Sequence, residues 1–133
     1  MWILVLITVN VCSLFASLIA AKPIKVFLKR HKTIADEYVL EEFKTMVRHQ
    51  MYMVYFILFF NVIGLFLSIV AVVNHGLIGL IVALVTNACS FYQSQYFRKI
   101  EKRARSLDTA NELLARRYYQ ISDTWVNKPL PDF

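Results

Sequence analysis

Residues 51–96 contain no Asp, Glu, Lys or Arg. This stretch is too long for a single membrane crossing, which takes about 20 residues of α-helix. A polar turn ending in Gly76 lies near its middle, and glycine tolerates a positive φ better than any other residue. We therefore expect a tight helical hairpin made of two membrane spans, 51–73 and 77–96.

Charged residues are scarce in the chain as a whole. Only 18% of the 133 residues are charged, 58% are hydrophobic, and the mean hydropathy is +0.50. Such a composition is unusual for a soluble protein and indicates an integral membrane protein. The length leaves no room for a separate soluble domain, so we expect one membrane domain covering residues 1–133.

Cysteine and metal-ligand patterns are also missing. The two cysteines, Cys12 and Cys89, both fall in apolar stretches, so we expect small buried side chains and no disulfide framework. A zinc site would need four N or S ligands, and the three histidines lie outside the expected spans. We expect no metal and no other cofactor.

Catalytic motifs are absent. The chain has only three glycines and contains no glycine-rich phosphate loop, H-E-x-x-H, G-x-S-x-G or C-x-x-C-H. We therefore predict that the protein is not an enzyme and has no catalytic residues. The alternative is a catalytic site shared with another subunit, to which Tyr52, His49 or His75 would contribute.

Residues 2–21 form another uncharged stretch. A cleaved signal peptide is the competing interpretation, but no Lys or Arg precedes the stretch and no small-x-small cleavage site follows it. We expect a retained first span that ends at Pro23, because proline interrupts helical hydrogen bonding.

The distribution of basic residues predicts the topology. Segments 22–50 and 97–133 carry seven and eight Lys or Arg, whereas residues 1–21 and the turn at 74–76 carry none. Under the positive-inside rule this pattern places the N-terminus outside and the C-terminus inside. The expected fold class is an all-α integral membrane protein with three transmembrane helices and cytoplasmic amphipathic helical extensions of spans two and three.

The first cytoplasmic arm is expected at 33–50. Thr33 and Asp36 resemble a capping box, which predicts a helix start at Thr33. Apolar residues then recur at three- and four-residue spacing, so the arm is amphipathic and continues into span two. The preceding residues, 24–32, mix apolar and basic side chains and are expected to lie on the lipid headgroups.

The second cytoplasmic arm is expected at 97–125, where apolar residues alternate at spacings of three and four as in a coiled coil. Asn111 falls at an a position, and Arg103 is placed to face Asp108 of a partner helix. One interpretation is a homo-oligomer through 97–125. The alternative is packing against helix 33–50 of the same chain, running in the opposite direction. The tail, 126–133, is expected to be extended and ordered only by a partner.

Three asparagines, Asn10, Asn61 and Asn87, fall near the centres of the three spans. An amide at the bilayer centre needs a hydrogen-bond partner, since hydrocarbon supplies none. We predict interhelical polar contacts at these positions and expect Asn87 to be the most enclosed. The alternative is a polar lining for a substrate or ion path.

Small residues on the spans predict where helices pack closely. The candidate packing residues are Gly64, Ser68, Gly79, Ala83 and Ser90. The net charge of +6 comes from basic residues beside the apolar spans, where anionic headgroups are nearer partners than nucleic acid. The candidate contacts to anionic lipid are Lys22, Lys25, Lys29, Arg30, Arg98, Lys99 and Lys102.

These features predict a non-catalytic structural or accessory subunit of a larger multi-subunit membrane complex, with other integral membrane proteins and anionic lipids as partners and no nucleic acid. The expected location is a bacterial or archaeal cell membrane or an organelle inner membrane, with several crossings. The alternative function is a small homo-oligomeric channel or transporter with a midplane path lined by asparagine.

Overall fold

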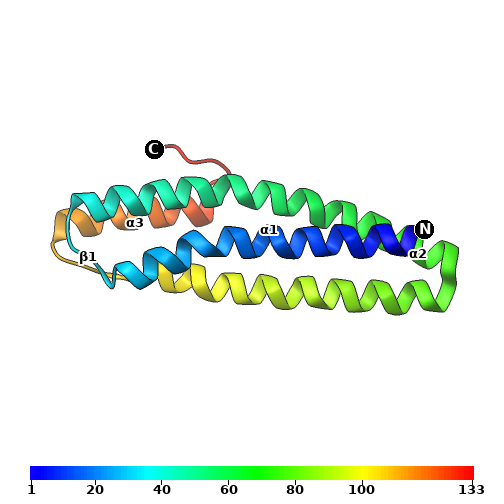
Figure 1. Ribbon diagram of the computed structural model, residues 1–133. Helices are drawn as coiled ribbons and strands as arrows, with labels where there is room; N and C mark the ends of the chain where they lie inside the picture. Colours follow the sequence, from blue (N-terminus) through cyan, green and yellow to red (C-terminus); the bar gives the residue numbers. More distant parts are fainter. The chain divides into compact units, whose positions relative to one another are not determined.

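The computed structural model describes all residues, 1–133, and about 85% of them are helical. The elements in chain order are α1 (Trp2–Arg30), β1 (Thr33–Ile34), α2 (Glu37–Ala104), β2 (Asp108–Thr109) and α3 (Glu112–Asn127) (Figure 1). The helical fold class is therefore confirmed, apart from one short parallel pairing in which β1 bonds to β2. Two helices, α1 and α2, are long and apolar enough to cross a membrane.

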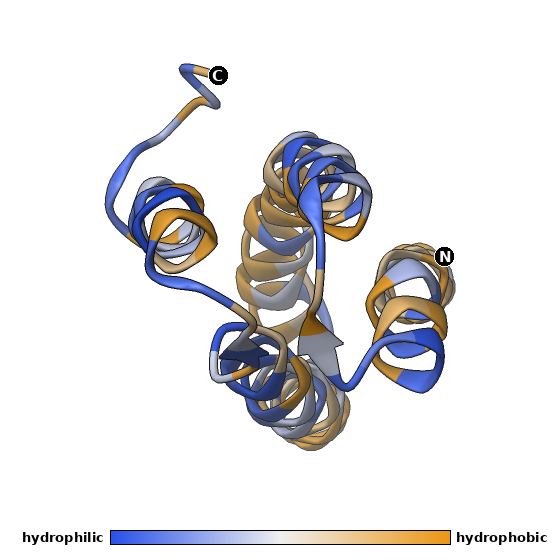
Figure 2. Ribbon diagram, turned by 90° about the vertical axis from the view of Figure 1, so that its left-hand side faces the viewer, coloured by the Kyte–Doolittle hydropathy of each residue, from blue (hydrophilic) through white to orange (hydrophobic).

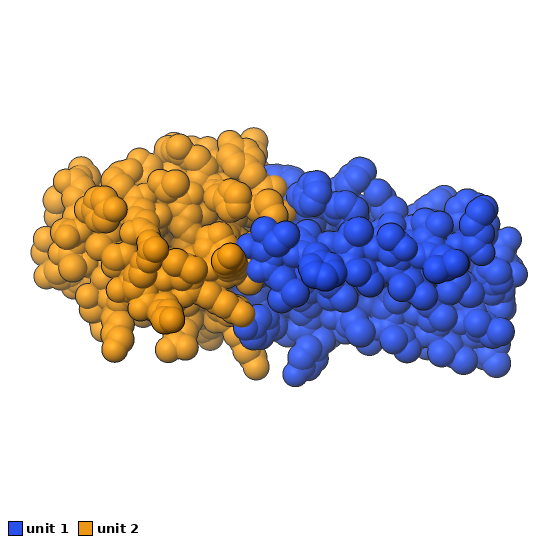
Figure 3. Space-filling view, viewed as in Figure 1, with its two compact units in different colours: residues 1–19, 55–97 blue, residues 20–54, 98–133 orange.

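The chain divides into two compact units, coloured separately in Figure 3. Unit 1 consists of Met1–Ile19 and Tyr55–Phe97, and unit 2 consists of Ala20–Val54 and Arg98–Phe133. All 15 Lys and Arg and all 9 Asp and Glu belong to unit 2. The charged residues are thus confined to one of the two units.

Unit 1 contains a helical hairpin. Within α2, Gly76 alone departs from helical geometry, with φ of 52° and ψ of −125°, which confirms the turn predicted there. Beyond the turn, Gly79 lies against the backbone of Ala71, and Asn87 reaches Ser68. Residue numbers rise on one segment as they fall on the other, so the two segments of α2 run antiparallel.

The apolar core of unit 1 joins α1 to this hairpin. Leu6 of α1 is fully buried and packs in one cluster with Leu67 and Ala71 of α2. Most other apolar side chains of the unit face outward. In the most apolar 18-residue part of each helix, only 28% is buried for α1 and 22% for α2. A core helix of a soluble protein is mostly buried.

The prediction that Pro23 ends the first helix is wrong, because α1 continues to Arg30 with Pro23 inside it. Proline fixes φ near its helical value and removes one backbone donor, so the cost is local. On the far side of the proline, Ile24 and Phe27 are buried, and their packing favours continuation of the helix. The interfacial segment expected at 24–32 is therefore partly a core element of unit 2.

The predicted helix start at Thr33 is also wrong. Thr33 and Ile34 pair with residues of β2, and α2 begins at Glu37. Asp36 is the N-cap: its carboxylate accepts a hydrogen bond from the backbone N–H of Val39 at 2.9 Å. The acidic side chain therefore caps the helix from outside its first turn, instead of completing a capping box within it.

The continuous helix predicted over 97–125 is interrupted. The α2 helix ends at Ala104, and α3 begins at Glu112. Asn111, predicted at a buried coiled-coil position, is the N-cap of α3 and accepts from Leu114 N–H at 2.9 Å. The predicted pairing of Arg103 with Asp108 therefore has no helical seam to support it.

The core of unit 2 is a group of aromatic rings. Phe43 of α2 contacts Phe27 of α1 at 5.6 Å between centroids, and Tyr118 and Trp125 of α3 at 4.9 and 6.2 Å. Figure 1 shows α3 beside the start of α2, and Figure 2 shows α3 apolar on one side and polar on the other. The C-terminal apolar stripe thus packs within the chain, but both helices follow parallel strands, so α3 runs parallel to α2 where an antiparallel arrangement was expected.

Candidate functional site

The three asparagines predicted near the centres of the spans lie in unit 1, and each contacts a serine on a different helical segment. Ser90 Oγ donates to Asn10 Oδ1 at 3.2 Å, and Ser13 Oγ donates to Asn61 Oδ1 at 3.4 Å. Asn87 Nδ2 donates to Ser68 Oγ at 3.1 Å. The three amides therefore bond to hydroxyl groups on other helical segments.

Two of these amides are open to the outside of the chain. Asn10 is half-buried, whereas Asn61 and Asn87 are exposed. The expectation that Asn87 is the most enclosed of the three is therefore wrong. On the same helical face, the smaller residues Ala83 and Ser90 are buried and half-buried.

The amides surround a pocket of about 200 Å³. Its walls come from α1 and from both segments of α2, and its lining consists of Asn10, Asn61, Gly64, Leu65, Asn87, Ser90 and Phe91. No lining residue is charged. The pocket is thus lined by uncharged polar and apolar residues together.

Small residues allow the helices around this pocket to approach closely. A Cβ atom added at Gly79 would lie 2.1 Å from the carbonyl oxygen of Ala71, so only glycine fits there. Gly64 is less tightly packed, since its Cβ position is 3.7 Å from Asn10 Nδ2. Of the other predicted packing residues, Ser68 and Ala83 are buried and Ser90 is half-buried.

The residues predicted to contact anionic lipid all belong to unit 2, and all are exposed. Arg30 also pairs with Glu42 at 3.7 Å. Glu42 in addition bonds to His31 Nε2 at 3.0 Å. The exposed residues of this set are Lys22, Lys25, Lys29, Arg30, Arg98, Lys99 and Lys102.

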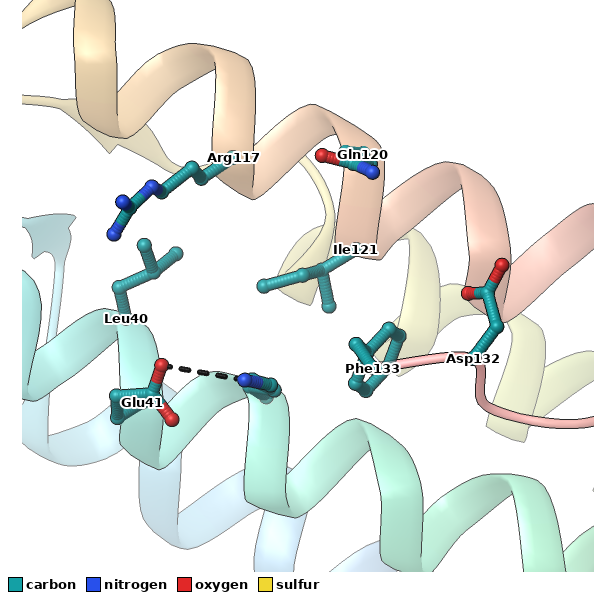
Figure 4. A pocket seen from close by; sticks show the side chains of 8 residues that line it. Leu40, Glu41, Arg117, Gln120, Ile121, Asp132 and Phe133 are labelled. Atoms are coloured by element: carbon teal, nitrogen blue, oxygen red, sulfur yellow. Dashed lines mark hydrogen bonds and ion pairs between the residues drawn. The ribbon is translucent and has the colours of Figure 1, made fainter.

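A second recess, of about 370 Å³, lies in unit 2 between α2, α3 and the C-terminal tail (Figure 4). Leu40 and Ile121 extend into it from the two helices, and Phe133 faces it from the tail. The Phe133 ring lies 6.0 Å from Lys44 Nζ and 5.9 Å from Arg48 Cζ, and Arg48 donates to the Phe133 oxygen. The tail, expected to need a partner, is therefore held by its own chain.

Two titratable groups of unit 2 have shifted pKa values with clear causes. Burial raises the pKa of the Glu101 carboxyl above its usual range, although Arg105 and Arg98 oppose the shift. Burial likewise raises the pKa of the Tyr118 hydroxyl. That hydroxyl donates to Ala104 O at 2.7 Å and accepts from Leu107 N–H at 3.0 Å, which connects α3 to the end of α2.

Two glutamines were missed as interhelical contacts. Gln93 Nε2 donates to Leu14 O at 3.1 Å, and the fully buried Gln50 donates through Nε2 to Ala20 O at 2.7 Å. Both lie on apolar helical faces where a long polar side chain needs a partner, and this was the available signal. Cys12 and Cys89, expected to be buried, are exposed, and no three potential metal-ligating side chains gather at one place.

No protein-family model matches this chain, and no curated protein or solved structure matches it. Its function is therefore argued from its own residues.

Proposed function

We propose that this protein is a non-catalytic accessory subunit that packs against other integral membrane proteins. The observation that carries the proposal is the exposure of Asn61 and Asn87 on a unit without any charged residue. An amide that faces hydrocarbon lacks hydrogen-bond partners and is costly. A neighbouring transmembrane helix would supply them.

The membrane topology forms part of this proposal. Unit 1 is the membrane-embedded part, with α1 crossing once and α2 crossing twice around Gly76. Its outward apolar side chains support this placement, because burying such surface in lipid is favourable. The N-terminus is outside and the basic residues of unit 2 face the inner leaflet, where each contributes about 1 kcal/mol of attraction to anionic lipid near the surface.

The test is the composition of the particle that contains the full-length tagged chain. After solubilisation of its native membrane in a mild detergent, the chain should comigrate on size-exclusion chromatography with different membrane proteins in fixed stoichiometry. A control with an unrelated tagged membrane protein of similar size identifies contaminants. Recovery of the chain only as a monodisperse homo-oligomer would contradict the proposal.

A second function, a homo-oligomeric channel or transporter, is favoured by one observation. Three asparagines from three helical segments line the same pocket. The pocket contains no ionisable side chain, which proton and ion pathways usually use. The same chromatography separates the two functions, and solute flux into vesicles containing the purified chain alone would support the channel.

A further inference from the structure

The pocket of unit 1 lined by Asn10, Asn61 and Asn87 has hydrogen-bonding capacity that the chain does not use. Asn87 donates both amide hydrogens, one to Ser68 Oγ at 3.1 Å and one to Ala83 O at 2.7 Å. Its side-chain oxygen, which can accept two bonds, remains available. Because Ala83 O is only an acceptor, the nitrogen of Asn87 must be the atom that faces it.

In Asn61 the unused hydrogen-bonding group is a donor, whereas in Asn87 it is an acceptor. Its oxygen accepts from Ser13 Oγ at 3.4 Å, and its amide nitrogen is available to a group outside the chain. Asn10 donates one of its two amide hydrogens to Leu6 O at 2.9 Å and accepts from Ser90. The pocket therefore presents unused amide donors at Asn10 and Asn61 and an unused amide acceptor at Asn87.

A group that bonds to both Asn61 Nδ2 and Asn87 Oδ1 must offer an acceptor and a donor. It must also be uncharged, because unit 1 holds no charged residue to neutralise it. A lipid ester offers acceptors only. One water molecule occupies about 30 Å³ of liquid and therefore fills only part of the pocket of about 200 Å³. An amide has adjacent C=O and N–H groups and meets each requirement.

The shape of the site limits the source of this amide. A recess requires a projecting group, so the same recess on a second copy of the chain does not fill it. Resting on the proposed function, we infer that the pocket receives the side-chain amide of an Asn or Gln from a transmembrane helix of a partner subunit. Its carbonyl oxygen accepts from Asn61, and its N–H donates to Asn87 Oδ1.

Site-specific photocrosslinking in the native membrane tests this inference. Phe91 lines the pocket and is 66% exposed, so benzoylphenylalanine at this position samples the occupant. The matched control is the same substitution at Phe59, which is 61% exposed and does not line the pocket. The Phe91 crosslink should map to an apolar helix of another subunit, within one helical turn of an Asn or Gln, and the Phe59 crosslink should not.

A double-mutant cycle then tests whether that amide bonds to Asn61. The expected result is about threefold to fifteenfold weaker association for Asn61→Leu and for the partner's amide replaced by Leu, with the double variant no weaker than either single variant. Additive losses would overturn the inference. If Asn61→Leu does not accumulate, the crosslink at Phe91 still shows whether a partner helix carrying Asn or Gln occupies the pocket.

The remaining outcomes separate this inference from the proposed function. A Phe91 crosslink to lipid alone, to a second copy of this chain, or to a partner helix without Asn or Gln overturns the inference while leaving a multi-subunit complex intact. Absence of any partner protein in the solubilised particle overturns both.

Discussion

The contact at Gly79 yields a sharp stability prediction. A Cβ atom at this position would lie 2.1 Å from Ala71 O and 2.5 Å from Ala71 C, whereas real Cβ atoms essentially never approach closer than 3.0 Å. The obstructing atoms are backbone, so no side chain can rotate away. Gly79→Ala must therefore separate the two segments of α2 by roughly 1 Å, since side-chain and backbone atoms in packed interiors already touch.

The magnitude follows from three terms. Overpacking of a well-packed site costs about 1 to 3 kcal/mol. Separation also weakens the bond from Asn87 to Ser68, and interhelical bonds in membranes contribute about 0.6 to 1.7 kcal/mol. Alanine gains about 1 kcal/mol over glycine in helix propensity. The net loss for Gly79→Ala is then about 1 to 4 kcal/mol of the free energy of unfolding.

Gly64→Ala is the matched control. Its Cβ atom would lie 3.7 Å from Asn10 Nδ2, an ordinary van der Waals contact, so the helix-propensity gain should make this variant as stable as the wild type or up to about 1 kcal/mol more stable. The assay is unfolding of the purified full chain in mixed micelles, followed by circular dichroism as the denaturing detergent is increased. Wild-type stability of Gly79→Ala, or a larger loss for Gly64→Ala, would refute the close approach of these segments.

Three further predictions concern unit 2. Tyr118→Phe removes the hydroxyl that bonds two backbone groups at the end of α2 and should lower the free energy of unfolding by about 1 to 3 kcal/mol in the same assay. Because burial raises the pKa of Glu101, the folded chain holds the carboxyl proton more tightly than the unfolded chain does. The stability that this group contributes is fully present below pH 4.5 and is lost as the pH rises through the folded pKa. Glu101→Gln should remove that loss in a pH series of unfolding curves. Neutralising the basic residues of segment 22–32 should weaken the preference for an external N-terminus. The residues to replace are Lys22, Lys25, Lys29, Arg30 and Lys32. A topology reporter at residue 1 that stays outside in every molecule would contradict this account.

The helical hairpin was predictable because its causes are local. An uncharged stretch of suitable length and one glycine in a polar turn suffice to place the bend at Gly76. The cap at Asn111 was also signalled locally, since asparagine followed by Glu112 is a common helix start. The regular apolar spacing across 97–125 outweighed that signal in the prediction, although the spacing continues through a turn that reverses the chain.

The course of α1 beyond Pro23 depends on contacts distant in sequence. Phe27 is buried because Phe43 packs 5.6 Å from it, and no pattern within residues 24–32 announces that neighbour. The choice of serine as the partner of Asn10, Asn61 and Asn87 is similar. It depends on which residues the packing brings opposite one another, and small-residue stripes restrict that choice without deciding it.

The structure assigns different roles to the small and the polar residues of unit 1. Gly79 packs against the backbone of Ala71 in the same chain, so its replacement should change stability. Asn61 is exposed and retains an available donor, so its replacement should change association more than stability. Asn10 lies between these cases, because it is half-buried and already bonded through both its oxygen and its nitrogen. If association and unfolding respond in proportion at all three positions, the amides stabilise the fold and do not recognise a partner.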